Sequence, residues 1–237
     1  MEFIYKLKNI FFDILFPSIC LNCKINLTID EKNKKVCEKC IDSIIIYSSF
    51  FCPKCKNRVP TQEKTCHKEI KFLLAPVTDY QNPVIKNIIR FFKYKKWKSL
   101  MVIITPLINN YLDNLSQDLK SFIIIPIPLH KDRFKERGFN QSEYIAKVIS
   151  EKTKAEINTG NLKRIKATKT QADSKNLEER VKNIKNCFAL ENPEEIKNKN
   201  ILLVDDVFTS GSTMTEAVKI LKQSGAKKII AFVLAKA

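Results

Sequence analysis

Short apolar runs and longer amphipathic stretches alternate along most of the chain. The short runs predict buried strands at residues 72–80, 122–128, 187–190, 201–204 and 228–234. Apolar residues at helical spacing predict helices at residues 82–97, 100–112, 140–153 and 214–223. Strands that alternate with helices predict an α/β fold, with a mainly parallel sheet flanked by helices. In such folds, ligands gather beyond the C-terminal ends of the strands.

One predicted strand leads into the most informative segment of the chain. Residues 201–213 read Ile-Leu-Leu-Val-Asp-Asp-Val-Phe-Thr-Ser-Gly-Ser-Thr, and a predicted helix follows. The loop amides and the positive end of the helix dipole can hold a phosphate. Asp205 and Asp206 can accept hydrogen bonds from two sugar hydroxyls or help to hold a divalent cation. The pattern therefore predicts a site for an anionic sugar, with chance acidic residues in an ordinary strand–loop–helix as the alternative.

A second candidate anion site follows the strand predicted at 122–128. The strand ends in a proline-bounded turn and a basic cluster, which could present Pro128, Arg133 and Arg137 to an anion such as pyrophosphate. His130 lies beside this turn, where a structural role is favoured over that of a general base. The polar, positively charged stretch 162–186 is long enough to predict a flap over the site.

Seven of the eight cysteines lie between residues 20 and 66. Two Cys-x2-Cys pairs thirteen residues apart suit a four-thiolate structural zinc site, formed by Cys20, Cys23, Cys37 and Cys40. Without a secretory signal, a disulfide framework is disfavoured. A third pair, Cys52 and Cys55, precedes Cys66 and predicts a possible second zinc site, whose fourth ligand is either His67 or Glu69. The alternatives are a metal-free hairpin and a second lobe that shares ligands with the first.

The chain carries a net charge of +17, and residues 76–190 hold 22 of its 42 Lys and Arg. A basic field attracts phosphates of nucleotides or nucleic acid, although compositional drift explains the excess equally well. Basic and aromatic residues interleave at Arg90, Lys93, Lys95, Lys96 and Trp97, as in a stacking platform for single-stranded DNA. An amphipathic helix with solvated lysines is the favoured explanation, because Ile85, Ile88, Ile89 and Phe92 form an apolar face.

No apolar run is long enough to span a membrane, and no cleavage site follows the apolar residues of 1–16, which predict a short amphipathic helix. We therefore expect a cytoplasmic protein. The distribution of cysteines predicts two parts: residues 1–75, with the N-terminal helix and zinc-ribbon module, and residues 76–237, with the parallel sheet.

The 201–213 block resembles the phosphoribosyl-diphosphate (PRPP) motif of type I phosphoribosyltransferases at every position. The order of the motifs along nearly the whole chain resembles the ComF/ComFC family of competence proteins, with Glu69 standing where that pattern has a cysteine. The motifs are the three Cys-x2-Cys pairs, Arg137-Gly-Phe-Asn-Gln141, Thr170-Gln171, Arg180-x2-Asn183 and the 201–213 block. The family resemblance implies a zinc-ribbon module, a phosphoribosyltransferase-type domain, and handling of incoming single-stranded DNA in natural transformation.

For a transferase, the resemblance implies displacement of pyrophosphate from C1 of Mg2+-bound PRPP by a nitrogen nucleophile. Asp205 and Asp206 would contact the ribose hydroxyls and act catalytically, and the 126–137 turn would receive pyrophosphate. The 5-phosphate would bind to Thr209, Ser210, Gly211, Ser212 and Thr213. The alternative is a non-enzymatic DNA-binding or adaptor protein that keeps the PRPP pocket as a sensor or relic. A helicase or another DNA-uptake protein is the expected partner in either case.

Overall fold

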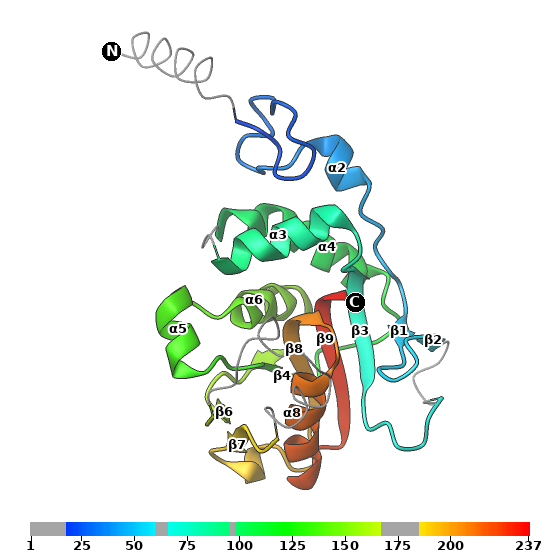
Figure 1. The fold of residues 1–237 in the computed structure, drawn as a ribbon. Coiled ribbons are helices and arrows are strands. Elements are labelled where there is room, and N and C mark those ends of the chain that lie inside the picture. The colour runs from blue at the N-terminus through cyan, green and yellow to red at the C-terminus, as the bar shows by residue number, and fades with distance from the viewer. Residues whose placement is uncertain (1–17, 60–65, 95–97, 167–184) are drawn as a thin grey trace.

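The computed structural model describes residues 18–59, 66–94, 98–166 and 185–237. Its centre is a seven-stranded sheet in the order β2-β1-β3-β9-β8-β4-β5 (Figure 1). The five strands from β3 to β5 in this order are parallel, whereas β1 and β2 are antiparallel. The sheet strands are β1 (Phe50–Phe51), β2 (Arg58–Val59), β3 (Leu73–Asp79), β4 (Phe122–Pro126), β5 (Glu156–Ile157), β8 (Asn200–Phe208) and β9 (Lys228–Lys236).

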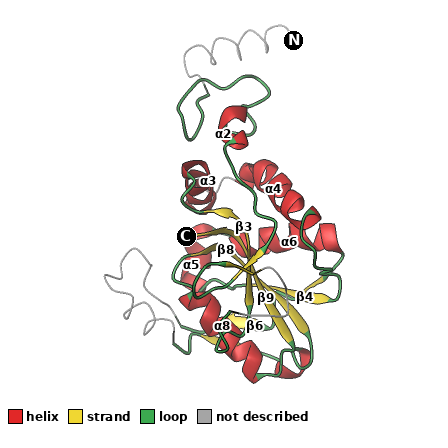
Figure 2. Cartoon of the chain, turned by 90° about the vertical axis from the view of Figure 1, so that its right-hand side faces the viewer, coloured by secondary structure: helices red, strands yellow, loops and turns green. Residues whose placement is uncertain are grey.

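Helices cover both faces of the sheet because its central strands are apolar on both faces. Leu202 and Val204 of β8 pack with α3, α4 and α6 in one buried cluster. Ile201 and Leu203 of the same strand pack with α8 in the other. Figure 2 shows the helices on the two faces of the sheet from the side. The helices are α3 (Pro83–Tyr94), α4 (Met101–Asp113), α6 (Gln141–Thr153) and α8 (Ser212–Gln223).

The order of the strands creates a crevice between the C-terminal ends of β4 and β8. These two strands are parallel neighbours, with Pro126 opposite Val204. From β4 the chain continues through α6 to the outer strand β5, whereas from β8 it continues through α8 to β9 on the other side. Because the two connections diverge, the strand ends form a topological switch point, where open α/β sheets bind their ligands.

The predicted strands and helices of the sheet are confirmed with small shifts at their ends. The interpretation of residues 126–137 as a turn is wrong in part, because Lys131–Arg137 forms a short helix, α5. This helix begins at His130 and ends at Gly138, whose φ of +76° closes it. The stretch expected to form a flap is flanked by β6 (Leu162–Arg164), which pairs with β7 (Phe188–Leu190) as an antiparallel ribbon. Residues 167–184, on which that prediction mainly falls, lie outside the described part.

The cysteine-rich region is joined directly to the sheet. It contains the short helix α2 (Glu38–Asp42), and strand β1 pairs with β3 through Phe51 and Leu74. The hydroxyl of Tyr47 donates to Asp79 at 2.9 Å, and the side chain of Asn87 in α3 donates to Asn22 at 3.2 Å. The amphipathic helix expected at 1–16 lies outside the described residues. Within the described residues, no helix is long and apolar enough to cross a membrane.

Gly211 fixes the junction between β8 and α8. It precedes the first residue of the helix with a φ of +75°, in the left-handed region that disfavours side chains. A Cβ atom built there would lie 2.4 Å from Cζ of Phe208, whose ring is buried beneath the loop. The loop can therefore sit this close to the end of β8 only because residue 211 has no side chain.

We predict that Gly211→Ala lowers the free energy of unfolding by about 1–3 kcal/mol, because the substitution adds backbone strain and a clash with Phe208. Gly160→Ala is the matched control, because nothing lies within 4 Å of its added Cβ, and it should change stability by less than about 0.5 kcal/mol. Urea denaturation of both variants provides the measurement. If the two variants were equally stable, the close contact between residue 211 and Phe208 would not constrain the loop.

Candidate functional site

The loop after β8 has the geometry of an anion-binding helix start. Gly211 stands at the N-cap position of the twelve-residue helix α8 and has no side chain to cap it, while the N–H of Ser212 lies 3.5 Å from the hydroxyl oxygen of Ser210. The hydroxyls of Ser210 and Ser212 lie 3.0 Å apart, and both residues are accessible at the surface. A small cavity of about 30 Å³ lies beneath the loop, and its lining includes Asp205, Phe208, Gly211 and Thr213. The helix start and the hydroxyls of the loop therefore lie around a space next to a carboxylate.

Asp205 is held at the inner wall of this cavity by two hydrogen bonds to one oxygen. Its Oδ1 accepts from the hydroxyl of Ser142 at 3.0 Å and from the backbone N–H of Asp206 at 2.9 Å. Burial, and then the neighbouring charge of Asp206, raise the pKa of Asp205 to about 6, against the lowering effects of Lys93 and the two donors. Asp205 can therefore exchange a proton at mildly acidic pH, near 6.

Asp206 points in another direction and has a cation of its own. Its Oδ1 lies 2.8 Å from Nζ of Lys93, which reaches it from the end of α3, and only 7% of Asp206 is exposed. The adjacent carboxylates of β8 thus have different partners, Lys93 for Asp206 and Ser142 for Asp205. From the sequence, Lys93 was a candidate for a DNA-binding surface, and no sequence pattern identified Lys93 or Ser142 as a partner of the acidic pair.

Ser142 is positioned by the start of α6. Asn140 caps this helix, with its Oδ1 accepting from the N–H of Ser142 at 3.2 Å and its amide donating to the carbonyl of Ile127 at 3.0 Å. Asn140 and Ser142 are both almost fully buried. The cap therefore ties the end of β4 to the helix that supports Asp205. The only sequence signal for it was the Asn-Gln-Ser run at a predicted helix start.

Three arginines gather on the β4 side of the crevice. Burial, and then the charges of Arg164 and Arg137, lower the pKa of Arg133, so the three guanidinium groups repel one another. Arg137 donates to Oε1 of Gln141 at 3.1 Å and lies 5.6 Å from the ring of Tyr94. Within the described residues, Nε of Arg137 and Nε2 of Gln141 are buried without a hydrogen-bond partner. Unpaired buried donors in a positively charged environment suit an anion.

The other predicted residues of this region have less specific surroundings. Pro128 lies half-buried between β4 and α5. His130 is the N-cap of α5, with Nδ1 lying 3.4 Å from the backbone nitrogen and 3.0 Å from the carboxylate of Asp132, which supplies a structural role. Arg90 is exposed on α3, whose predicted apolar face is buried. Lys95, Lys96 and Trp97 lie outside the described residues.

The first cysteine cluster has the donor set of a structural zinc site. The sulfur atoms of Cys20, Cys23, Cys37 and Cys40 lie within 4.8 Å of one another, and none of the eight cysteines forms a disulfide. The backbone N–H of Cys37 donates to the sulfur of Cys20 at 3.4 Å. Burial opposes ionisation of Cys20, but this N–H and others nearby lower its pKa to about 6. Four converging sulfurs with amide donors suit zinc.

The second cluster answers the question left open between His67 and Glu69. Sulfur atoms of Cys52, Cys55 and Cys66 gather with a ring nitrogen of His67, and Nδ1 of His67 lies 3.5 Å from the sulfur of Cys52. Glu69 lies outside this group and pairs with Lys54 at 2.5 Å. The neighbouring residues Cys66 and His67 thus both belong to one cluster, an arrangement that the sequence alone did not favour. Three thiolates and one imidazole form a common structural zinc set.

The turns at Cys20–Cys23 and Cys52–Cys55 share one backbone geometry. The N–H of Cys20 donates to the carbonyl of Ile25, and the N–H of Cys52 donates to that of Asn57, both at 2.9 Å. Lys24 and Lys56 follow the second cysteine of each turn with φ values of +65° and +58°. The third Cys-x2-Cys pair is therefore built like the first, and the metal-free hairpin is not needed to explain it.

Comparison with known proteins agrees with this division of features. The families described as "Phosphoribosyl transferase domain" and "Double zinc ribbon domain" match residues 143–237 and 11–71. "Competence protein F" of Haemophilus influenzae is 28% identical over 232 residues, covering 92% of this chain and 96% of that protein. "DNA utilization protein YhgH" of Escherichia coli K12 is 25% identical, with coverages of 90% and 94%. "Competence protein ComFC" of Bacillus subtilis is 26% identical, with coverages of 87% and 90%.

We predict two zinc ions per chain, with His67 as a ligand of the second. His67→Ala should lose one zinc under chelator dialysis that leaves both ions in the wild type, because three ligands hold the metal less tightly than four. Glu69→Gln is the matched control and should keep two. Elemental analysis by mass spectrometry gives the stoichiometry. If loss followed Glu69→Gln rather than His67→Ala, the ligand assignment would be wrong.

We also predict a specific pH dependence of stability from Asp205. Its raised pKa means that the folded state keeps a proton which the unfolded chain loses near pH 4, so stability falls as pH rises from about 4 to 6 and stays lower above. Asp205→Asn should therefore be more stable than the wild type by about 1–3 kcal/mol at pH 7.5 and nearly equal to it at pH 4. Urea denaturation across this range gives the difference.

Asp206→Asn is the informative control for Asp205→Asn. It leaves the ammonium group of Lys93 without its carboxylate partner, so at pH 7.5 it should lower stability instead of raising it. The two neighbouring substitutions remove the same charge and should have opposite signs. A difference between Asp205→Asn and the wild type that is independent of pH would show that Asp205 is not the titrating group.

Proposed function

The chain belongs to the ComF/ComFC family of competence proteins, and on that premise we propose that it binds PRPP at the crevice between β4 and β8. We further propose that it handles incoming single-stranded DNA during natural transformation. The observation that carries the first proposal is the placement of two adjacent carboxylates, Asp206 buried and Asp205 partly buried, beside the N-terminus of α8 at a topological switch point. Few small anions other than sugar phosphates need both groups at once.

The proposal assigns one part of PRPP to each part of the crevice. The loop 209–213 holds the 5-phosphate with its amides and hydroxyls, assisted by the dipole of α8. Asp205 and Asp206 lie beside the ribose hydroxyls, and Asp205 lines the same small cavity as the loop. Both carboxylates also suit Mg2+, which PRPP carries, because hard divalent cations prefer oxygen ligands.

The pyrophosphate group is assigned to the arginine cluster. Arg133 and Arg137 project from α5, beyond the end of β4, and Arg164 adds a third cation from β6. The structure thus adds Arg164 to the two arginines chosen from the sequence. Mutual repulsion among the guanidinium groups is relieved when a multiply charged anion lies between them.

In a transferase, the residues would act by position and charge. The bond between C1 and the pyrophosphate oxygen breaks, a nitrogen of the acceptor forms the new bond, and pyrophosphate leaves with the electron pair. The carboxylates of β8 stabilise positive charge that develops on the ribose, and the arginines stabilise the departing pyrophosphate. The acidic residues thus have a catalytic role in addition to binding.

We propose that residues 1–75 and 76–237 are the two functional parts, with the zinc ribbons serving as the docking part for a helicase or another uptake protein. The boundary falls within β3, whose first half pairs with β1. A structural zinc site with four protein ligands leaves no open position for catalysis, which favours docking or support as the role of the clusters.

Titration calorimetry of the zinc-loaded protein with PRPP and Mg2+ tests the binding proposal. The wild type should bind, and Asp205→Asn and Asp206→Asn should each bind at least about tenfold more weakly, since each removes a charged hydrogen-bond acceptor. Glu194→Gln, an exposed substitution in the 3-10 turn Pro193–Glu195, should have no effect. If the wild type did not bind PRPP, the assignment of the crevice as a PRPP site would be wrong.

A second comparison isolates the pyrophosphate contact. Arg133→Gln should weaken binding of PRPP but leave binding of ribose 5-phosphate unchanged, because only PRPP carries the group assigned to the arginines. Lys131→Gln in the same short helix is the control. Pyrophosphate release from labelled PRPP in cell extract then separates a transferase from a sensor, since a sensor binds PRPP without releasing pyrophosphate.

A further inference from the structure

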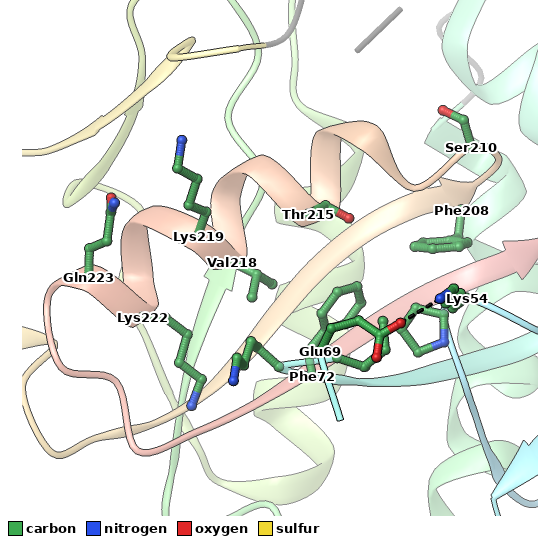
Figure 3. A pocket seen from close by; sticks show the side chains of 13 residues that line it. Lys54, Glu69, Phe72, Phe208, Ser210, Thr215, Val218, Lys219, Lys222 and Gln223 are labelled. Atoms are coloured by element: carbon green, nitrogen blue, oxygen red, sulfur yellow. Dashed lines mark hydrogen bonds and ion pairs between the residues drawn. The ribbon is translucent and has the colours of Figure 1, made fainter. Parts of the chain in front are cut away.

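An elongated hollow runs along α8 on the side of the sheet opposite to α3 and α6. Its main part has a volume of about 560 Å³ and lies between the third Cys-x2-Cys turn, Cys52–Cys55, and the helix (Figure 3). A second hollow of about 250 Å³ continues it and shares Ile70, Lys71, Phe72 and Lys222 with it. We call the two together the α8 trough. It extends from Ser210 in the loop to Lys227 and Lys228 at the start of β9.

The floor of the trough is apolar and includes aromatic rings. Phe72, Phe208 and Val218 line the main hollow, and Figure 3 shows them gathered between α8 and the strands. Each is at most 5% exposed, so these side chains are fixed by packing below and leave only a small surface to the hollow. The flat face of an aromatic group, such as a nucleobase, can lie on such a floor without disturbing the core.

Positive charge predominates along the trough, although Lys219 at its edge lies 3.9 Å from the carboxylate of Glu216. Lys71 and Lys222 line both hollows, and Lys219 and Lys227 lie along the edges. Among the lining residues Glu69 is the one carboxylate, and its ion pair with Lys54 already neutralises it. The trough therefore attracts anions and offers them cations at several points along its length.

Lys71 and Lys222 form the centre of this charge. The ammonium group of Lys222 is fixed by donating to the carbonyls of Ala226 at 3.0 Å and Lys227 at 2.8 Å, which leaves one N–H available. Burial, and then the charge of Lys71, lower the pKa of Lys222. Within the described residues Lys71 has no ion pair or side-chain hydrogen bond of its own. Two like charges are thus held close together, and an anion between them would stabilise both.

We propose that the α8 trough binds a short stretch of single-stranded nucleic acid, with a base on the apolar floor and phosphates beside Lys71 and Lys222. From Thr215 to Gln223 the helix runs about 12 Å, which is longer than one small anion needs. Aromatic surface combined with cations along a groove is how proteins hold single strands, whereas a duplex keeps its bases stacked inside. The inference rests on the DNA-handling half of the proposed function and not on PRPP binding.

The trough is separate from the surface that the sequence suggested for DNA. Arg90 and Lys93 belong to α3 on the other face of the sheet, and Lys93 is engaged with Asp206. The trough instead lies between the second zinc cluster and α8, so the Cys-x2-Cys turn supplies one of its walls through Pro53 and Lys54. The second zinc site would thereby shape a binding surface as well as stabilise its own turn.

Fluorescence anisotropy of a labelled oligothymidylate tests the proposal on the zinc-loaded full chain. Lys71→Glu combined with Lys222→Gln should weaken binding at least tenfold and lower the slope of log affinity against log salt by about 1, because fewer counterions are released. The glutamine keeps a donor for the carbonyls that Lys222 contacts. Lys147→Glu combined with Lys152→Gln on α6 removes equal charge from the other face and should change affinity less than twofold.

Photocrosslinking gives an independent readout. An oligonucleotide with 4-thiothymidine should crosslink to peptides containing residues 69–72 or 215–223. If the wild type binds the strand, but both double variants bind equally well or the crosslinks lie elsewhere, the trough is not the site and the DNA-handling proposal survives. If the wild type binds no single strand, both fail. If the wild type bound a duplex of the same length equally well, the proposal that a base stacks on the floor of the trough would be wrong. PRPP titrations of the same variants should match the wild type.

Discussion

The burial of two adjacent carboxylates at the end of β8 is the constraint on which the rest of the site depends. An unpaired buried charge costs several kcal/mol, so each carboxylate needs a partner. Asp206 obtains it from Lys93 of α3, and Asp205 from Ser142 of α6. These helices are fixed by apolar faces against the same side of the sheet. Correct packing of the helices therefore delivers the polar partners, and the acidic pair in turn penalises any other arrangement of them.

The two carboxylates are consequently not equivalent. Asp206 is matched by a cation, whereas Asp205 receives only neutral donors and carries the raised pKa. A ligand that brings hydroxyl donors or a cation to Asp205 favours its ionised form, so binding at pH values near or below the pKa of about 6 is linked to release of a proton. Below that pH the protonated carboxyl of Asp205 reduces the negative charge that an anionic ligand meets at the site.

Local patterns predicted much of the fold, because they depend on neighbours in the sequence. The apolar run before Asp205, the glycine at 211 and the Cys-x2-Cys spacings each predicted a feature that the structure contains. Contacts between distant segments could not be predicted in this way. Lys93 reaches Asp206 across more than a hundred residues, and only the folded hairpin decides that His67 rather than Glu69 joins the second cluster. Spacing identifies candidate ligands, whereas packing selects among them.

Phe208 joins the two proposed binding surfaces through a single ring. It lines the small cavity beneath the 209–213 loop and the floor of the α8 trough, and its ring leaves no room for a side chain at Gly211. A ring held so closely on one side cannot move toward the trough without releasing the loop. If both ligands bind as proposed, each would stabilise one position of this ring. Thermodynamic linkage then requires that PRPP and the single strand alter each other's affinity by the same factor.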